Sequence, residues 1–151
     1  MGSNWNNLLS SYRNNGLYFL KNPEGTKNEF EKVAQQHGLK PFVINMQNVT
    51  RKQTFLRKMA AALNFPDCFG NNWDALFDSL TDLSWLEAGE YLILINNLHM
   101  LATRSPENFK FITQVFKAAA DYWRSRKTPF YIVISEKHPV SGSLSHEGSP
   151  L

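Results

Sequence analysis

The chain has 151 residues, which is enough for one domain with a sizeable hydrophobic core. Apolar residues make up 42% of the chain, its net charge is +3, and one cysteine precludes an internal disulfide, so we expect a globular protein of a reducing compartment. No apolar run reaches membrane-spanning length and no secretory signal is visible, which predicts a cytoplasmic protein without a membrane partner.

The first 39 residues predict a helix, a strand and a second helix. Apolar residues recur at helical spacing over 5–12, and an apolar run follows at 16–20. Asparagine, proline and glycine at 22–25 predict a turn. The helix after this turn should end at Gly38, because glycine suits the position that follows a helix.

Two pairs of polar residues predict where helices begin. Thr26 with Glu29, and Thr50 with Gln53, each have the spacing of a capping box, in which the two side chains satisfy the first backbone N–H groups of a helix. Each pair is followed by apolar residues at helical spacing. We therefore expect one amphipathic helix after each pair.

Three further apolar runs predict strands at 42–45, 91–95 and 130–134. Ser105 and Pro106 predict the start of a long helix, with serine as the cap and proline in the first turn. Strands that alternate with helices favour parallel pairing. The predicted class is α/β, with a small parallel sheet of three to four strands flanked by helices.

The segment 66–85 predicts a loop that leads into one short helix. Asn71 or Asn72 can cap this helix by accepting a hydrogen bond from a backbone N–H. The apolar residues that follow have the spacing of one buried helical face: Trp73, Leu76, Phe77, Leu80 and Leu83.

Asp74, Asp78 and Asp82 recur every four residues and so form another stripe of the same predicted helix. Like charges at this spacing repel each other, so fold stability does not explain the row. Between Lys58 and Arg104 the chain has six acidic residues and no Lys or Arg, which leaves +9 for the rest of the chain. This segment is either a binding site for a basic partner or a solvated acidic face.

Few residues point to catalysis or to a cofactor. Cys68 and the four scattered histidines lack the spacing of metal ligands and of a nucleophile with its base. No phosphate-binding glycine loop is present, and no motif that reads nucleic acid accompanies the basic clusters, so we expect neither a cofactor nor direct nucleic-acid binding. Asp74 and Asp78 as an acid–base pair keep a small hydrolase or nucleotide-binding enzyme as the alternative function.

Residues 66–83 resemble the barstar family of intracellular ribonuclease inhibitors, whose motif is close to P-x-x-[YF]-G-x-N-x-D-A-L-[WF]-D-x-L. Ten positions of this chain fit that motif: Pro66, Phe69, Gly70, Asn72, Asp74, Ala75, Leu76, Phe77, Asp78 and Leu80. The resemblance extends less specifically over 40–135. It implies a three-stranded parallel sheet with helices around it, to which the strand at 16–20 would be an addition.

The resemblance also implies a function, namely inhibition of a ribonuclease by occlusion of its basic active site. Asp78 matches the family residue that takes the position of a substrate phosphate, and Asp74 matches one that pairs with nearby basic groups. The residues that match Asn72, Trp73 and Phe77 lie at or beside the contact surface. We expect a basic ribonuclease or toxin nuclease domain as partner, met by an inhibitor or immunity protein that is a monomer when free.

Four residues depart from the family's best-known member. Cys68 replaces an aromatic contact residue, Asp82 and Leu83 replace a Gly-Trp pair, and Ala118 replaces a glutamate of the late helix. The cognate enzyme is therefore expected to differ. Cys68 and Asp82 complete the predicted partner-binding residues.

The resemblance divides the chain into three parts. We expect an N-terminal extension at 1–39 packed on the main domain, a barstar-like domain at 40–136, and a disordered tail at 137–151. Exposed carboxylates at Asp74 and Asp78 would favour an inhibitor, whereas carboxylates inside a pocket would favour an enzyme.

Overall fold

A four-stranded parallel sheet forms the centre of the protein. The structure is a computed structural model, and it describes residues 2–21, 23–66, 72–86 and 88–136. The strands are β1 (Gly16–Lys21), β2 (Pro41–Asn45), β3 (Tyr91–Asn96) and β4 (Phe130–Glu136). Their order in the sheet is β1-β4-β3-β2, and every pair is parallel. The predicted α/β class and all four predicted strands are confirmed.

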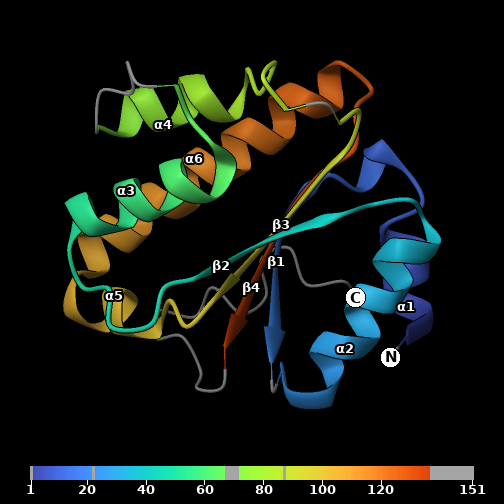
Figure 1. Ribbon diagram of the computed structural model, residues 1–151, viewed down its shortest axis with the longest axis horizontal. Coiled ribbons are helices and arrows are strands. Elements are labelled where there is room, and N and C mark those ends of the chain that lie inside the picture. The colour runs from blue at the N-terminus through green and yellow to red at the C-terminus, as the bar shows by residue number, and fades with distance from the viewer. Residues whose placement is uncertain (1, 22, 67–71, 87, 137–151) are drawn as a thin grey trace.

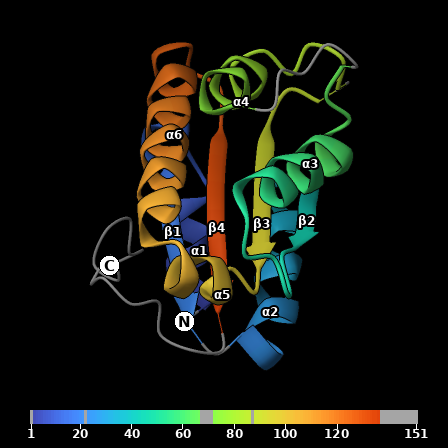
Figure 2. The same ribbon diagram turned by 90° about the vertical axis from the view of Figure 1, so that its left-hand side faces the viewer.

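Helices cover both faces of the sheet, so the protein has three layers (Figures 1 and 2). One face carries α3 (Lys52–Leu63), α4 (Trp73–Leu80), α5 (His99–Arg104) and α6 (Pro106–Ser125). The other carries α1 (Gly2–Leu8) and α2 (Pro23–Gln36), and the 3-10 helix η1 (Tyr12–Asn14) leads into β1. None of the helices in the described ranges is long and apolar enough to span a membrane.

The central strands are buried on both sides, which explains their continuous apolar runs. On β3, Ile93 and Ile95 belong to the core beneath α3 to α6, whereas Leu92 and Leu94 belong to the core shared with α1 and α2. All four side chains are fully buried. The side chains of a strand alternate between its two faces, so β3 contributes to both cores.

The predicted turn at 22–25 is wrong, because α2 already begins at Pro23. Proline is well suited to the first turn of a helix, since its fixed φ is helical and it has no N–H to leave unpaired. Thr26 consequently lies inside α2 and does not cap it. The predicted end of this helix is confirmed: α2 ends at Gln36, and Gly38, two residues beyond, has a φ of +75°.

The predicted capping box at Thr50 is also wrong. The chain remains extended through Arg51, and α3 begins at Lys52 without a side-chain cap. Ser105 is confirmed as the residue before α6, but its hydroxyl donates to the carbonyl of Thr50 at 3.3 Å rather than capping the helix. The short helix α5 was not expected from the sequence.

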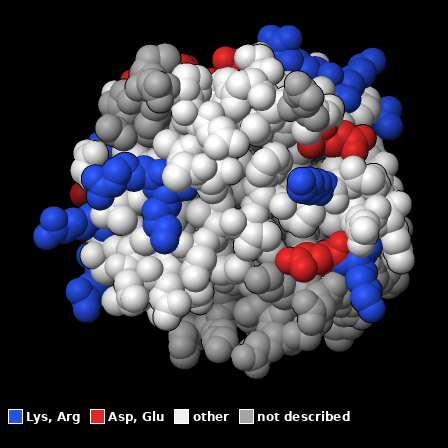
Figure 3. Space-filling model, in the orientation of Figure 1, with Lys and Arg blue, Asp and Glu red and all other residues white. Residues whose placement is uncertain are grey.

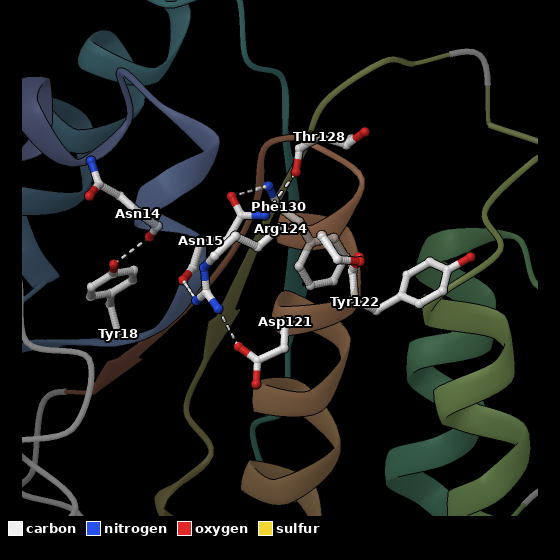
Figure 4. A network of polar contacts seen from close by, with 9 residues as sticks. Asn14, Asn15, Tyr18, Asp121, Tyr122, Arg124, Thr128 and Phe130 are labelled. Atoms are coloured by element: carbon white, nitrogen blue, oxygen red, sulfur yellow. Dashed lines mark hydrogen bonds and ion pairs between the residues drawn. The ribbon is translucent and has the colours of Figure 1, made fainter.

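A buried asparagine joins the start of β1 to the end of α6 and the start of β4 (Figure 4). The Asn15 amide donates to the carbonyl of Thr128 at 2.8 Å and accepts from the N–H of Phe130 at 2.9 Å. Arg124 of α6 donates to the carbonyl of Asn15 at 2.6 Å and also pairs with Asp121 at 2.5 Å. The three hydrogen bonds of Asn15 connect residues more than 100 positions apart in the chain.

Two tyrosine hydroxyls add to this junction. Tyr131 of β4 donates to the carbonyl of Ser11 at 2.7 Å, and Tyr18 of β1 donates to the carbonyl of Asn14. Burial raises the pKa of both tyrosines. Because β1 pairs along β4, the N-terminal residues extend the sheet. The predicted division of the chain at residue 39 stays a prediction. The predicted tail at 137–151 lies outside the described residues.

Candidate functional site

Helix α4 is held with one side in the core and the other in solvent. Asn72 is its N-cap, and its side-chain oxygen accepts from the N–H of Ala75 at 2.7 Å. Leu76 and Leu80 are fully buried beneath the helix. The N-cap fixes where α4 begins and the two leucines fix its rotation, so the opposite stripe of the helix points outward.

Asp74 and Asp78 lie on this outward stripe, one helical turn apart, and both are exposed. Among the residues that the structure describes, neither carboxylate takes part in an ion pair. Two like charges at this spacing destabilise a helix slightly. The two carboxylates are therefore open to solvent and accessible to another molecule.

Asp82 does not continue the row, so the predicted stripe of three aspartates is wrong. Helix α4 ends at Leu80, and Leu83 adopts a φ of +52° with its side chain fully buried. The Asp82 carboxylate accepts from the N–H of Ser84 at 3.2 Å. Burial, reinforced by the nearby Asp82 carboxylate, raises the pKa of Tyr91.

An open groove of about 710 Å³ runs between α4 and α6, which lie side by side in Figures 1 and 2. It is lined by residues of both helices and by the first residue of α3: Lys52, Asn72, Trp73, Asp74, Phe77, Asp78, Phe111, Gln114, Val115 and Ala118. Five of the seven predicted partner-binding residues are thus brought together. Asp82 does not line the groove, and Cys68 lies outside the described residues, as does Asn71, the alternative cap.

The geometry presents charge outward. Asp74 and Asp78 stand exposed at the edge of an open groove, whereas an acid–base pair is normally enclosed where water is limited. Within the described ranges, no group of three or more His, Cys, Asp or Glu residues could hold a metal ion. The arrangement is suited to receiving a basic surface.

A comparison with protein families matches residues 39–135 to Barstar (barnase inhibitor). The chain belongs to the barstar family. The match contains β2, β3 and β4 and begins after β1, so β1 and the helices beside it lie outside the matched region. No curated protein sequence matches the chain.

Trp73 has a structural as well as a surface role in this barstar-family protein. Its ring stacks on Phe111 of α6, with centroids 6.1 Å apart and planes at 15°, and it packs against Phe55 of α3 at 6.1 Å. The ammonium of Lys52 lies 5.3 Å from the centre of the Trp73 ring. The half-buried Trp73 therefore anchors α4 to both neighbouring helices.

Four residues of the groove were missed from the sequence: Lys52, Phe111, Gln114 and Val115. Phe111 offered a usable signal, because it lies off the buried stripe of α6 formed by Phe109, Ile112 and Phe116. Lys52 and Gln114 are residue types that are common on exposed helix surfaces, and Val115, like Phe111, lies off the buried stripe. Ala118, which the sequence comparison singled out as a departure from the family's best-known member, lies on the α6 side of the groove.

The basic residues of the chain are spread over several elements, unlike Asp74 and Asp78. On the face shown in Figure 3, Lys and Arg side chains gather in separate groups towards its two margins, with a broad uncharged area between them. Exposed basic residues come from several elements, among them Arg57 of α3 and Arg126 after α6. The positive charge is thus dispersed on this face, whereas Asp74 and Asp78 share one helix.

Proposed function

We propose that this protein inhibits a ribonuclease or a related toxin nuclease by placing α4 in the enzyme's basic, phosphate-binding active site. Membership of the barstar family supports this class of function. The observation that carries the proposal is a pair of exposed carboxylates, with no ion-pair partner among the described residues, on a helix whose opposite side is fully buried.

The electrostatics of a nuclease explain why such a helix would inhibit it. An enzyme that binds RNA gathers Arg, Lys and His around the phosphate positions, and these cations attract carboxylates equally well. In the proposed complex Asp78 occupies a phosphate position and Asp74 pairs with basic side chains of the enzyme nearby. Neither carboxylate carries a bond that the enzyme can cleave, so the active site stays blocked.

The rigidity of α4 favours tight binding. The cap at Asn72, the buried Leu76 and Leu80, and the packing of Trp73 hold the carboxylates in place before the partner arrives. Little conformational entropy is then lost on association. An immunity protein of this kind would act in the cytoplasm of the cell that makes the nuclease, and would need no catalytic activity of its own.

The test is calorimetric titration of the protein into a panel of catalytically disabled barnase-like ribonucleases at low and high salt. We expect tight binding that weakens as salt rises, because salt screens the charges that steer the two proteins together. Asp78→Ala should weaken binding by about 2–5 kcal/mol, a range set in part by the barnase–barstar pair itself.

Glu90→Ala is the matched control, since it removes one exposed carboxylate outside the groove. Equal losses from Asp78→Ala and Glu90→Ala would contradict the assignment of the site to α4. Failure to bind any ribonuclease of the panel at low salt would contradict the proposed class of partner.

A further inference from the structure

Helix α6 carries two apolar stripes, of which only the first is fully buried, while Val115 of the second packs against the edge of the core. The first, which includes Phe109, Ile112 and Phe116, is buried against the sheet and α3 to α5. The second consists of Phe111, Val115 and Ala118, spaced by four and three residues so that they follow one another along the groove. This second stripe is exposed or half-buried.

Phe111 is the more exposed of the two larger side chains in the second stripe, Phe111 and Val115. It is 43% exposed although it is an aromatic residue, and only Val43 on β2 is a comparably exposed large apolar side chain in the described part of the chain. One face of its ring stacks on Trp73 at an angle of 15°. The stacked rings of Phe111 and Trp73 therefore form one apolar surface, which we call the ledge.

This ledge and the two carboxylates belong to one groove. Phe111, Val115 and Ala118 line its α6 side, and Asp74 and Asp78 line its α4 side. A partner that fills the groove must meet apolar surface and negative charge at once. Removing water from the ledge also strengthens the neighbouring charged contacts, since electrostatic interactions grow as the local dielectric constant falls.

We propose that the groove binds a partner segment in which a large apolar side chain is flanked by arginine or lysine, and that Phe111 is the residue that selects for the apolar side chain. The inference rests on the proposed inhibitory function, because it concerns the same surface. The cations match Asp74 and Asp78, and the apolar side chain covers the ledge. Aromatic residues prefer such stacked or edge-on contacts.

The test is NMR titration of the isotope-labelled full chain with three acetylated and amidated pentapeptides. Ala-Arg-Phe-Arg-Ala combines both features, Ala-Arg-Ala-Arg-Ala keeps only the charge, and Ala-Gln-Phe-Gln-Ala keeps only the ring. We expect the first peptide to bind about three- to tenfold more tightly than the charged one, and to shift the Trp73 indole and Phe111 ring signals.

Phe111→Ser should reduce the affinity of Ala-Arg-Phe-Arg-Ala to that of Ala-Arg-Ala-Arg-Ala. Val43→Ser is the matched control, because it removes an equally exposed apolar side chain that does not line the groove and should change nothing. Phe111→Leu, which keeps an apolar side chain without the stacked ring, provides a milder variant, and thermal unfolding of each variant verifies that it is folded.

Equal binding of the two arginine peptides, unchanged by Phe111→Ser, would overturn the role of Phe111 and leave the proposed inhibition untouched. Absence of binding by all three peptides would overturn this inference alone if the ribonuclease titration succeeds. Failure of both experiments would remove the proposed function together with the inference.

Discussion

The junction at Asn15 and the outer side of α4 differ in whether their polar groups are paired within the chain. At the junction, both ends of the buried Asn15 amide are hydrogen-bonded, and Arg124 is bonded both to a carbonyl and to Asp121. On α4, Asp74 and Asp78 lie exposed with no ion-pair partner among the described residues. The first region satisfies its polar groups within the chain, whereas the second leaves its charges for another molecule.

The difference separates stability from function. A buried polar group costs free energy unless it is hydrogen-bonded, so the contacts of Asn15 contribute to the folded state itself. An exposed carboxylate keeps its hydration, and the energy of pairing it becomes available only when a partner binds. Substitutions at the junction should therefore lower the free energy of unfolding, whereas those on the outer side of α4 should mainly change the affinity for a partner.

Asn15→Ala should have the largest effect on stability. It leaves the buried N–H of Phe130 without its acceptor and the carbonyl of Thr128 without its donor. We expect the free energy of unfolding to fall by about 1–3 kcal/mol, as measured by urea denaturation. Asn7→Ala, at an exposed asparagine, is the control, and an equal loss there would refute the special role of Asn15.

The tyrosines of the junction predict a smaller, pH-dependent effect. Burial raises the pKa of Tyr131, so the folded protein keeps this proton at pH values where the unfolded chain, with a tyrosine pKa of about 10, releases it. The unfolded state then binds fewer protons, and stability should fall as the pH rises above about 10. Urea denaturation at pH 8 and at pH 11 measures this fall.

Tyr131→Phe sharpens the same prediction. The variant loses the hydrogen bond to Ser11, at a cost of about 1 kcal/mol at pH 8, and it should show a shallower fall between pH 8 and pH 11. Tyr12→Phe, at a tyrosine outside this set of contacts, should keep the slope of the original chain. An unaltered slope in Tyr131→Phe would show that Tyr131 does not carry the effect.

The smallest expected change lies on α4 and has the opposite sign. Asp78→Asn removes the repulsion between Asp78 and Asp74, so the free energy of unfolding should rise by about 0.2–0.5 kcal/mol at low salt. Asp74→Asn should gain less, because Asp74 is in the first turn, where a negative charge is favoured by the helix dipole. A clear loss of stability in Asp78→Asn would mean that α4 needs this carboxylate for folding.

Short-range patterns were sufficient for much of the fold. Each of the four strands contains one of the predicted apolar runs, and Asn72, one of the two asparagines predicted as the cap, caps α4. Both signals are local, since a strand buried on both faces must be apolar throughout and a cap acts on the next three residues. Local signals failed where another local choice was equally allowed, as at Pro23, which began a helix instead of a turn.

The sequence by itself determined the α/β class, the helix that bears Asp74 and Asp78, and the unusual concentration of acidic residues around it. Only the tertiary structure decided that Asp82 leaves this row, because α4 ends at Leu80 and the chain then turns so that the Leu83 side chain is buried at a φ of +52°. Only the packing of α4 beside α6 brought Phe111 onto Trp73 and made the groove. Contacts between residues so far apart depend on how whole helices pack, and no spacing within either helix specifies them.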